Sequence, residues 1–258
     1  MSAQTSALIK LSISEHVATI SFNRPPMNPV NDAVLHQLDS ILGEIERQPS
    51  IIAVRIHGND RAFCAGADLK MVAERVGSET GAEAMRDTAM LFQRVYRRLE
   101  ALPALTIAEI EGIALGGGLE LALACDLRAA CETATLGLPE AKVGLLPGAG
   151  GTQRLTRLCG TGAAARLILS GELLKGGEAH RIGLIDYLAA TPEELKNTVQ
   201  QIISRTCALS HAAVRAAKTC IDEAAFRSQP GFVAEADGIY KLMTTQDAIV
   251  RVKEFAGR

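Results

Sequence analysis

Two glutamates of the chain lie among apolar and glycine residues, where a carboxyl group is usually either paired or functional. Glu120 follows three consecutive glycines and is surrounded by leucine and alanine, and Glu140 follows Pro139 shortly before the glycine-rich residues 144–151. Two such carboxyl groups, one ionised and one protonated, can move protons to and from a substrate in concert. Each of the two carboxyl groups is therefore a candidate functional group.

Each acidic residue of these stretches also has a purely structural interpretation. Glu120 could form a buried ion pair with Arg128, and Glu140 could be a first-turn acid that a helix dipole stabilises after Pro139. Asp68 could simply cap a helix after a tight turn. The residues alone leave these alternatives open.

The glycine-rich stretches indicate places where a ligand approaches the backbone. In residues 61–70, small side chains precede Asp68, and a helix that begins near Ala67 would offer unpaired N–H groups to an anion. Glycines at 116–118 cost backbone entropy, so a geometry that forbids Cβ atoms is expected there. The third stretch is not a phosphate-binding loop, because no lysine precedes Thr152, and it lacks the dinucleotide-binding pattern.

These residues need strands and helices to position them, and the hydrophobic periodicity predicts an alternation of the two. The expected strands are residues 8–13, 17–22, 51–56, 106–113 and 127–130, and the expected helices are residues 34–45, 85–102, 117–124 and one from residue 152. This alternation predicts a layered α/β fold.

From residue 192 onward the pattern is helical only. The expected helices are residues 195–203, 208–225, 233–243 and 247–255. We therefore expect a core of residues 1–200 that carries the active site and a helical C-terminal region of residues 201–258. No internal sequence repeat is detected, and the most loop-like interior segment, residues 76–84, could border a ligand entrance.

Composition and charge exclude several classes of protein. The 258 residues carry 27 basic and 29 acidic side chains that are scattered along the chain, so no polyanion-binding surface is expected. Six Phe, three Tyr and no Trp are too few for the stacking platforms of single-stranded nucleic-acid binding. Glutamates interrupt the apolar residues 101–125, which argues against a membrane span. Neither nucleic acid nor a membrane is therefore an expected partner.

The cysteines and the N-terminus bear on the compartment. Six cysteines without a C-x-x-C pair are expected to be reduced thiols in the core. The first residues lack the pattern of a targeting sequence, which predicts a cytoplasmic location.

Taken in order, the motifs resemble those of the crotonase superfamily, and most closely its enoyl-CoA hydratase branch. The similarity runs from ATISFNRP through AFCAGADL, GGGLELALACD and GLPEAKVGLLPGAGGTQRL to SGELLKGGEAHRIGLID. It implies an α/β fold of the crotonase type, a spiral of repeated ββα units with a helical C-terminal oligomerisation region. The same resemblance implies a homotrimer or homohexamer.

The resemblance also assigns roles to residues. It places an oxyanion hole at the backbone N–H groups of Ala67 and Gly117, and it matches Glu120 and Glu140 to the two catalytic glutamates of the hydratases. These matches imply addition of water to the α,β double bond of a 2-enoyl-CoA thioester, with Glu120 as the base and Glu140 as the acid. Coenzyme A is then part of the substrate, and no metal or other cofactor is expected.

The match to the coenzyme A site of the family is looser. The resemblance places the substrate against Ala65 and the adenine end of coenzyme A against Asp68, Leu69 and Lys70. The turn of residues 26–30 and the tail of residues 251–255 depart from the family pattern.

Two other functions stay open at this point. The chain could be an enoyl-CoA isomerase, in which Glu140 alone moves the proton. From another class, it could resemble the noncatalytic CoA-binding or RNA-binding relatives, although the retained carboxylates and the near-neutral charge argue against both.

Overall fold

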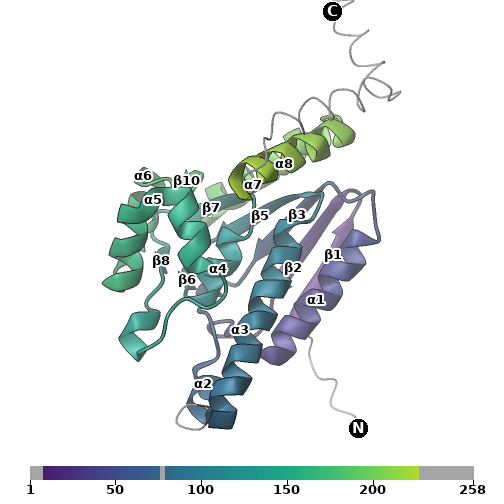
Figure 1. The fold of residues 1–258 in the computed structure, drawn as a ribbon. Helices are drawn as coiled ribbons and strands as arrows, with labels where there is room; N and C mark the ends of the chain where they lie inside the picture. Colours follow the sequence, from purple (N-terminus) through teal and green to yellow (C-terminus); the bar gives the residue numbers. More distant parts are fainter. Residues whose placement is uncertain (1–7, 76–78, 227–258) are drawn as a thin grey trace, which may run out of the picture.

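This computed structural model describes residues 8–75 and 79–226, and their strands form two separate β-sheets (Figure 1). The larger sheet contains, in spatial order, β1 (Ile9–Ser14), β2 (Val17–Phe22), β3 (Ala53–His57), β5 (Leu105–Ile110), β7 (Leu127–Cys131) and β10 (Tyr187–Ala189). The smaller sheet contains β4 (Ala62–Cys64), β6 (Ile113–Leu115), β8 (Thr135–Gly137) and β9 (Leu173–Lys175). β1 pairs antiparallel with β2 in a hairpin, and β2, β3, β5 and β7 run parallel.

The helices follow the strands along the chain. They are α1 (Asp32–Glu46), α2 (Leu69–Arg75), α3 (Glu79–Glu100), α4 (Gly117–Leu123), the 3-10 turn η1 (Glu140–Val143), α5 (Gly151–Leu169), α6 (Gly176–Arg181), α7 (Pro192–Cys207) and α8 (His211–Phe226). Local chemistry defines two of their starts. Asn31 caps α1 by accepting the N–H of Val34, and Thr191 caps α7 by accepting the N–H of Glu194.

A ββα unit recurs in the chain, as the resemblance implied. In each of the pairs β3 and β4, β5 and β6, and β7 and β8, the first strand joins the larger sheet and the second joins the smaller one. The prediction of one continuous strand over residues 106–113 was therefore wrong. The chain leaves the larger sheet after Ile110 and bends at Gly112, where a Cβ atom would lie 2.2 Å from the carbonyl oxygen of Arg61. The apolar residues on both sides of the bend continue the same pattern, so periodicity does not predict where the first strand ends.

The predicted loop of residues 76–84 was also wrong over most of its length. α3 begins at Glu79, whose charge suits a helix N-terminus, and Gly81 is buried rather than part of an exposed turn. The apolar face of α3 continues along Phe92, Val95 and Leu99 at helical spacing. Residues 76–78 lie outside the described residues.

The C-terminal part of the described chain is helical. No strand follows residue 192 within the described residues, as predicted, and α7 packs against β5, β7 and β10 of the larger sheet. The proposed division after residue 200 falls inside α7. The helices predicted at residues 233–243 and 247–255 lie outside the described residues.

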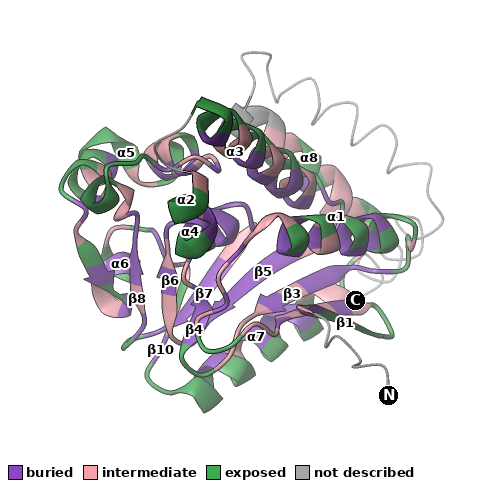
Figure 2. Cartoon of the chain, turned by 90° about the horizontal axis from the view of Figure 1, so that it is seen from below, coloured by how far each residue is buried: buried purple, intermediate pink, exposed green. Residues whose placement is uncertain are grey.

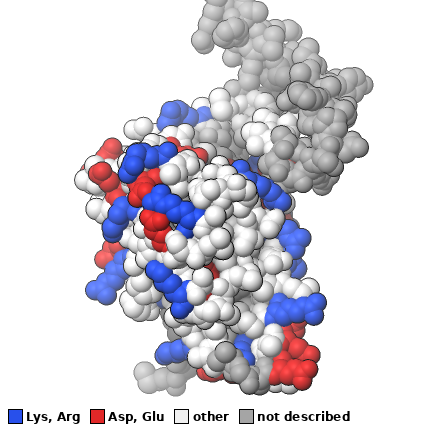
Figure 3. Space-filling view, turned by 60° about the vertical axis from the view of Figure 1, so that its left-hand side comes forward, with Lys and Arg blue, Asp and Glu red and all other residues white. Residues whose placement is uncertain are grey.

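Burial follows the arrangement of the sheets and the helices that cover them. The central strands of the larger sheet are buried, and the covering helices expose their outer faces (Figure 2). Basic and acidic side chains lie interspersed on the face shown in Figure 3, as the scattered charge of the sequence predicted. Within the described ranges, no helix is long and apolar enough to cross a bilayer.

The six cysteines are free thiols. Cys64, Cys125 and Cys131 are buried as predicted. Cys159 and Cys207 are partly buried and pack against the edge of the core, whereas the partly buried Cys220 is not part of it, so the expectation of core positions was wrong for Cys220.

Candidate active site

A cavity of about 660 Å³ collects the residues that the sequence singled out. Ala67 and Gly117 contribute to its wall, as do both Glu120 and Glu140. The remaining wall is largely apolar and comes from α2, α3 and the loop between η1 and α5. Four candidate residues from three separate chain segments thus meet in one place.

Ala67 presents a free N–H group at this cavity. It forms a parallel bridge with Val30, in which Val30 donates to the carbonyl of Gly66 at 2.8 Å and accepts from Asp68 at 2.8 Å. In such a bridge the N–H of the middle residue points away from the partner. Among the described residues, the N–H of Ala67 has no acceptor.

Gly117 presents a second free N–H group. It is the first residue of α4, where no intrahelical acceptor exists. A Cβ atom at Gly117 would lie 3.6 Å from the nitrogen of Ala67, so the two N–H-bearing segments are neighbours. Gly118 is forced to be glycine by packing, because its Cβ would lie 2.0 Å from the carbonyl oxygen of Cys64. Two unpaired donors side by side suit an oxygen that gains negative charge.

Glu120 is held by backbone donors. Its side chain is buried, and Oε1 accepts hydrogen bonds from the N–H groups of Ala149 at 2.8 Å and Gly151 at 2.7 Å. Burial raises the pKa of Glu120 to about 7, the two backbone donors oppose that rise, and the nearby Glu140 adds to it. The carboxyl group therefore changes its protonation state near neutral pH.

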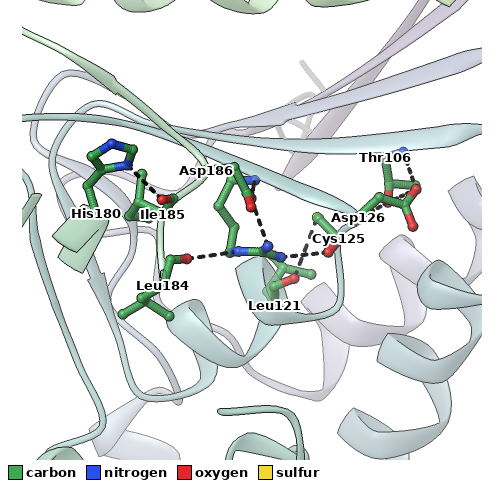
Figure 4. A network of polar contacts seen from close by, with 9 residues as sticks. Thr106, Leu121, Cys125, Asp126, His180, Leu184, Ile185 and Asp186 are labelled. Carbon is green, nitrogen blue, oxygen red and sulfur yellow. Dashed lines mark hydrogen bonds and ion pairs between the residues drawn. The ribbon is translucent and has the colours of Figure 1, made fainter. Parts of the chain in front are cut away.

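The alternative of an ion pair between Glu120 and Arg128 was wrong. The guanidinium of Arg128 instead contacts Asp186 at 2.7 Å and the carbonyl oxygens of Leu184 and Cys125, both at 2.9 Å (Figure 4). This network lies at the far end of α4, so the charge of Arg128 is already neutralised away from the cavity. The carboxyl group of Glu120 stays available for chemistry.

Glu140 is the more isolated carboxyl group. Its Oε2 is buried without a hydrogen-bond partner among the described residues, and burial raises the pKa of Glu140. Glu140 does begin a helical turn after Pro139, but η1 has only four residues and offers a small dipole. Oε1 lies 3.1 Å from the position that a Cβ of Gly116 would occupy, so the carboxyl group lies beside the start of α4.

The residues expected near coenzyme A divide into two groups. Ala65 and Leu69 line the cavity, whereas Asp68 and Lys70 do not. Asp68 forms an ion pair with Arg24 at 2.5 Å and accepts the N–H of Lys70 at 3.0 Å, so the capping interpretation was correct. Contact of these residues with coenzyme A stays a prediction.

The sequence reasoning missed side chains that hold the backbone of the site in place. The buried Arg154 donates to the carbonyl of Ala149 at 2.9 Å and is paired with Glu100 at 3.0 Å. The buried Tyr96 donates to the carbonyl of Gly117 at 2.9 Å. The only indication of these side chains in the sequence is the spacing of Tyr96 and Glu100, which are four residues apart and therefore lie on one face of α3.

The described part of the chain contains no cluster of three or more His, Cys, Asp or Glu side chains that could hold a metal ion. The site as built consists of two carboxyl groups and two backbone donors in one apolar cavity. Such a site can polarise a carbonyl oxygen and transfer protons next to it.

Fold and site together define an α/β protein of the crotonase type with two carboxyl groups beside two backbone donors. The sequence model of the enoyl-CoA hydratase/isomerase family matches residues 12–254, and the chain belongs to this family.

Individual relatives agree with this assignment. The chain is 39% identical to a short-chain-enoyl-CoA hydratase of Clostridium acetobutylicum over 80% of this chain and 77% of that protein. It is 36% identical to a crotonyl-CoA hydratase of Syntrophomonas wolfei over 93% and 91% of the two chains. Among solved structures, an enoyl-CoA hydratase from Bacillus anthracis superposes with a TM-score of 0.89 at 36% identity, covering 97% of this chain and 96% of the other.

Proposed function

We propose that the protein is an enoyl-CoA hydratase, which adds water reversibly to a 2-enoyl-CoA thioester and gives a 3-hydroxyacyl-CoA. The observation that carries the proposal is the meeting of Glu120, Glu140 and the free N–H groups of Ala67 and Gly117 at one cavity. The names of the two hydratase relatives support the same reaction.

The oxyanion hole acts on the thioester carbonyl. When water attacks Cβ, electron density moves through Cα onto the carbonyl oxygen and an enolate forms. The N–H groups of Ala67 and Gly117 stabilise that negative charge, and the apolar surroundings strengthen both hydrogen bonds.

The two carboxyl groups balance the protons. Ionised Glu120 accepts a proton from the attacking water, whose oxygen bonds to Cβ, and protonated Glu140 gives its proton to Cα. The backbone donors on Oε1 of Glu120 favour its ionised form, while the unpartnered Oε2 of Glu140 favours the protonated form. Because the two groups interact, the pair titrates as a unit.

An isomerase is the second candidate, and the isolated position of Glu140 favours it. Moving a double bond needs only one group that carries a proton between two carbons, and Oε2 of Glu140 has no hydrogen-bond partner among the described residues, while Oε1 lies beside Gly116.

Incubation with crotonyl-CoA, a hexenoyl-CoA and a 3-enoyl-CoA, with identification of the products by mass, tests both candidates. Gain of one water by the 2-enoyl substrates is the expected result. A product that only changes the double-bond position would favour the isomerase.

The protonation states predict the pH dependence of hydration. Glu120 must be ionised to act as a base, and burial raises its pKa to about 7. We therefore expect kcat/KM to fall about tenfold per pH unit below pH 7. It should also fall once Glu140, whose pKa is raised by burial, loses the proton that it must donate. A pH–rate profile with crotonyl-CoA measures both limbs, and a rate that stays constant from pH 8 down to pH 5 would contradict the role of Glu120.

We propose that the protein assembles into a homotrimer or homohexamer. Large aliphatic side chains are exposed on α5 and α8, among them Leu158, Leu169 and Ile221. Subunit contacts would remove such surface from water. Light scattering at micromolar concentration should return about three or six times the chain mass of 27.3 kDa. A mass near that of one chain would contradict the prediction.

We further propose that the reaction needs no metal or redox cofactor. Addition of water involves no net oxidation, and the backbone donors can polarise the thioester. Location in the cytoplasm stays a prediction from the sequence.

A further inference from the structure

Gln93 contacts the peptide that supports Glu120, although the proposed mechanism does not use it. It lies half-buried on α3, and its Nε2 donates to the carbonyl oxygen of Gly148 at 2.9 Å. That carbonyl and the N–H of Ala149 belong to the same planar peptide unit. The N–H in turn donates to Oε1 of Glu120 at 2.8 Å. Gln93 and Glu120 therefore hold opposite ends of one peptide.

The supported peptide lies in a segment that has little rigidity of its own. Residues 144–150 form neither helix nor strand, and Gly150 has a φ of 107°, a conformation that glycine adopts easily. The next peptide is held separately, by Arg154 on the carbonyl of Ala149. A Cβ of Gly148 would lie 3.6 Å from the Cβ of Ala89, so this segment lies directly on α3.

We propose that Gln93 is a positioning residue, which keeps the N–H of Ala149 aimed at the carboxylate of Glu120 by holding the carbonyl of Gly148. The proposal rests on the proposed function, in which Glu120 is the base. Gln93 does not touch the substrate in this assignment. It acts through the backbone and thereby sets how readily Glu120 ionises.

The charged groups around Glu120 are independent of Gln93. Glu120 faces Glu140 from η1, Arg154 from α5, which is paired with Glu100, and the phenol of Tyr96 from α3. A neutral substitution at residue 93 changes none of these charges. Because the bond from Ala149 favours the ionised carboxylate, its loss raises the pKa of Glu120.

The experiment compares matched substitutions of glutamine. Gln93→Met keeps the length and the helix propensity of the side chain but cannot donate a hydrogen bond. Gln93→Lys keeps a donor at this position. Gln200→Met places the same change on the exposed face of α7, where the side chain of Gln200 forms a hydrogen bond with Ser204 alone among the described residues. Circular dichroism verifies the fold, and Gln93→Leu replaces Gln93→Met if that variant does not fold.

Two measurements report on Glu120. The first is the pH–rate profile with crotonyl-CoA. The second is a ¹³C NMR titration of protein labelled at the glutamate side-chain carboxyl carbon, with Glu120→Gln used to assign the signal. A glutamate that titrates near pH 7 is well separated from ordinary glutamates, whose pKa is about 4.3.

For Gln93→Met we expect the acid limb and the NMR titration to move to higher pH by about half a pH unit or more. The rate should then fall about threefold or more at pH 6 and much less at pH 8. The acid limb and the NMR titration of the Gln93→Lys and Gln200→Met variants should not move to higher pH. Unchanged titration in a folded Gln93→Met variant, or an equal shift in Gln200→Met, would overturn the proposal. A wild-type protein that hydrates no enoyl-CoA would refute the proposed function instead, and the NMR titration would still decide the role of Gln93.

Discussion

Glu120→Gln and Glu140→Gln should each lower kcat for hydration of crotonyl-CoA by about a hundredfold or more, the usual contribution of general acid–base catalysis. Both variants keep the shape of the side chain and one oxygen that can accept hydrogen bonds. The amide group of glutamine, however, cannot act as the acid or the base of the reaction. Their effects should also be non-additive, because either change disables the same proton-transfer unit. Steady-state kinetics of the two single variants and the double variant measure this.

The control separates proton transfer from loss of a charge in general. Glu44→Gln makes the same substitution on the exposed face of α1 and should leave the rate unchanged. In an isomerase, Glu140→Gln would abolish turnover of a 3-enoyl-CoA while Glu120→Gln stays near the wild-type rate. Full hydratase activity in a folded Glu120→Gln variant would contradict the assignment of Glu120.

Gly117→Pro should lower kcat by about a hundredfold to a thousandfold, because loss of one oxyanion-hole donor costs about 2.7–4 kcal/mol. The fold should tolerate the change. Proline is common at the first position of a helix, and no described residue accepts the N–H of Gly117. Kinetics together with acyl-CoA binding by calorimetry distinguish a lost donor from a lost binding site.

Gly117→Ala is the matched control for this change. It retains the N–H but adds a methyl group 3.4 Å from Cε1 of Phe92 and 3.6 Å from the nitrogen of Ala67. Alanine therefore tests crowding of the hole without removing a donor, and its effect should be smaller than that of proline. If Gly117→Pro folds, binds acyl-CoA and turns over at the wild-type rate, the oxyanion hole lies elsewhere.

Local patterns predicted the parts of the fold that depend on local chemistry. Strands β1 and β2, helix α1 and the helix that begins at Gly117 follow from hydrophobic periodicity. The family resemblance then indicated which of the glycine-rich stretches meet. The cavity brings together Ala67, Gly117, Glu120 and Glu140 as that resemblance implied, although their catalytic roles stay predictions.

Long-range contacts explain what the sequence did not predict. Arg128 pairs with Asp186, which is 58 residues away, and no local pattern favours it over Glu120. The break between β5 and β6 depends on close packing of Gly112 against Arg61. Gln93 bonds to the carbonyl of Gly148, which is 55 residues away, so the spacing of residues within α3 does not predict this contact.

The most direct test of the proposed hydratase is one incubation of the pure protein with crotonyl-CoA in oxygen-18 water, followed by mass spectrometry of the thioester. We expect 3-hydroxybutyryl-CoA that carries the heavy oxygen at C3, formed by the wild type and lost in the Glu120→Gln, Glu140→Gln double variant. Recovery of crotonyl-CoA without added water, under conditions in which the protein is folded and binds the thioester, would contradict the proposed function.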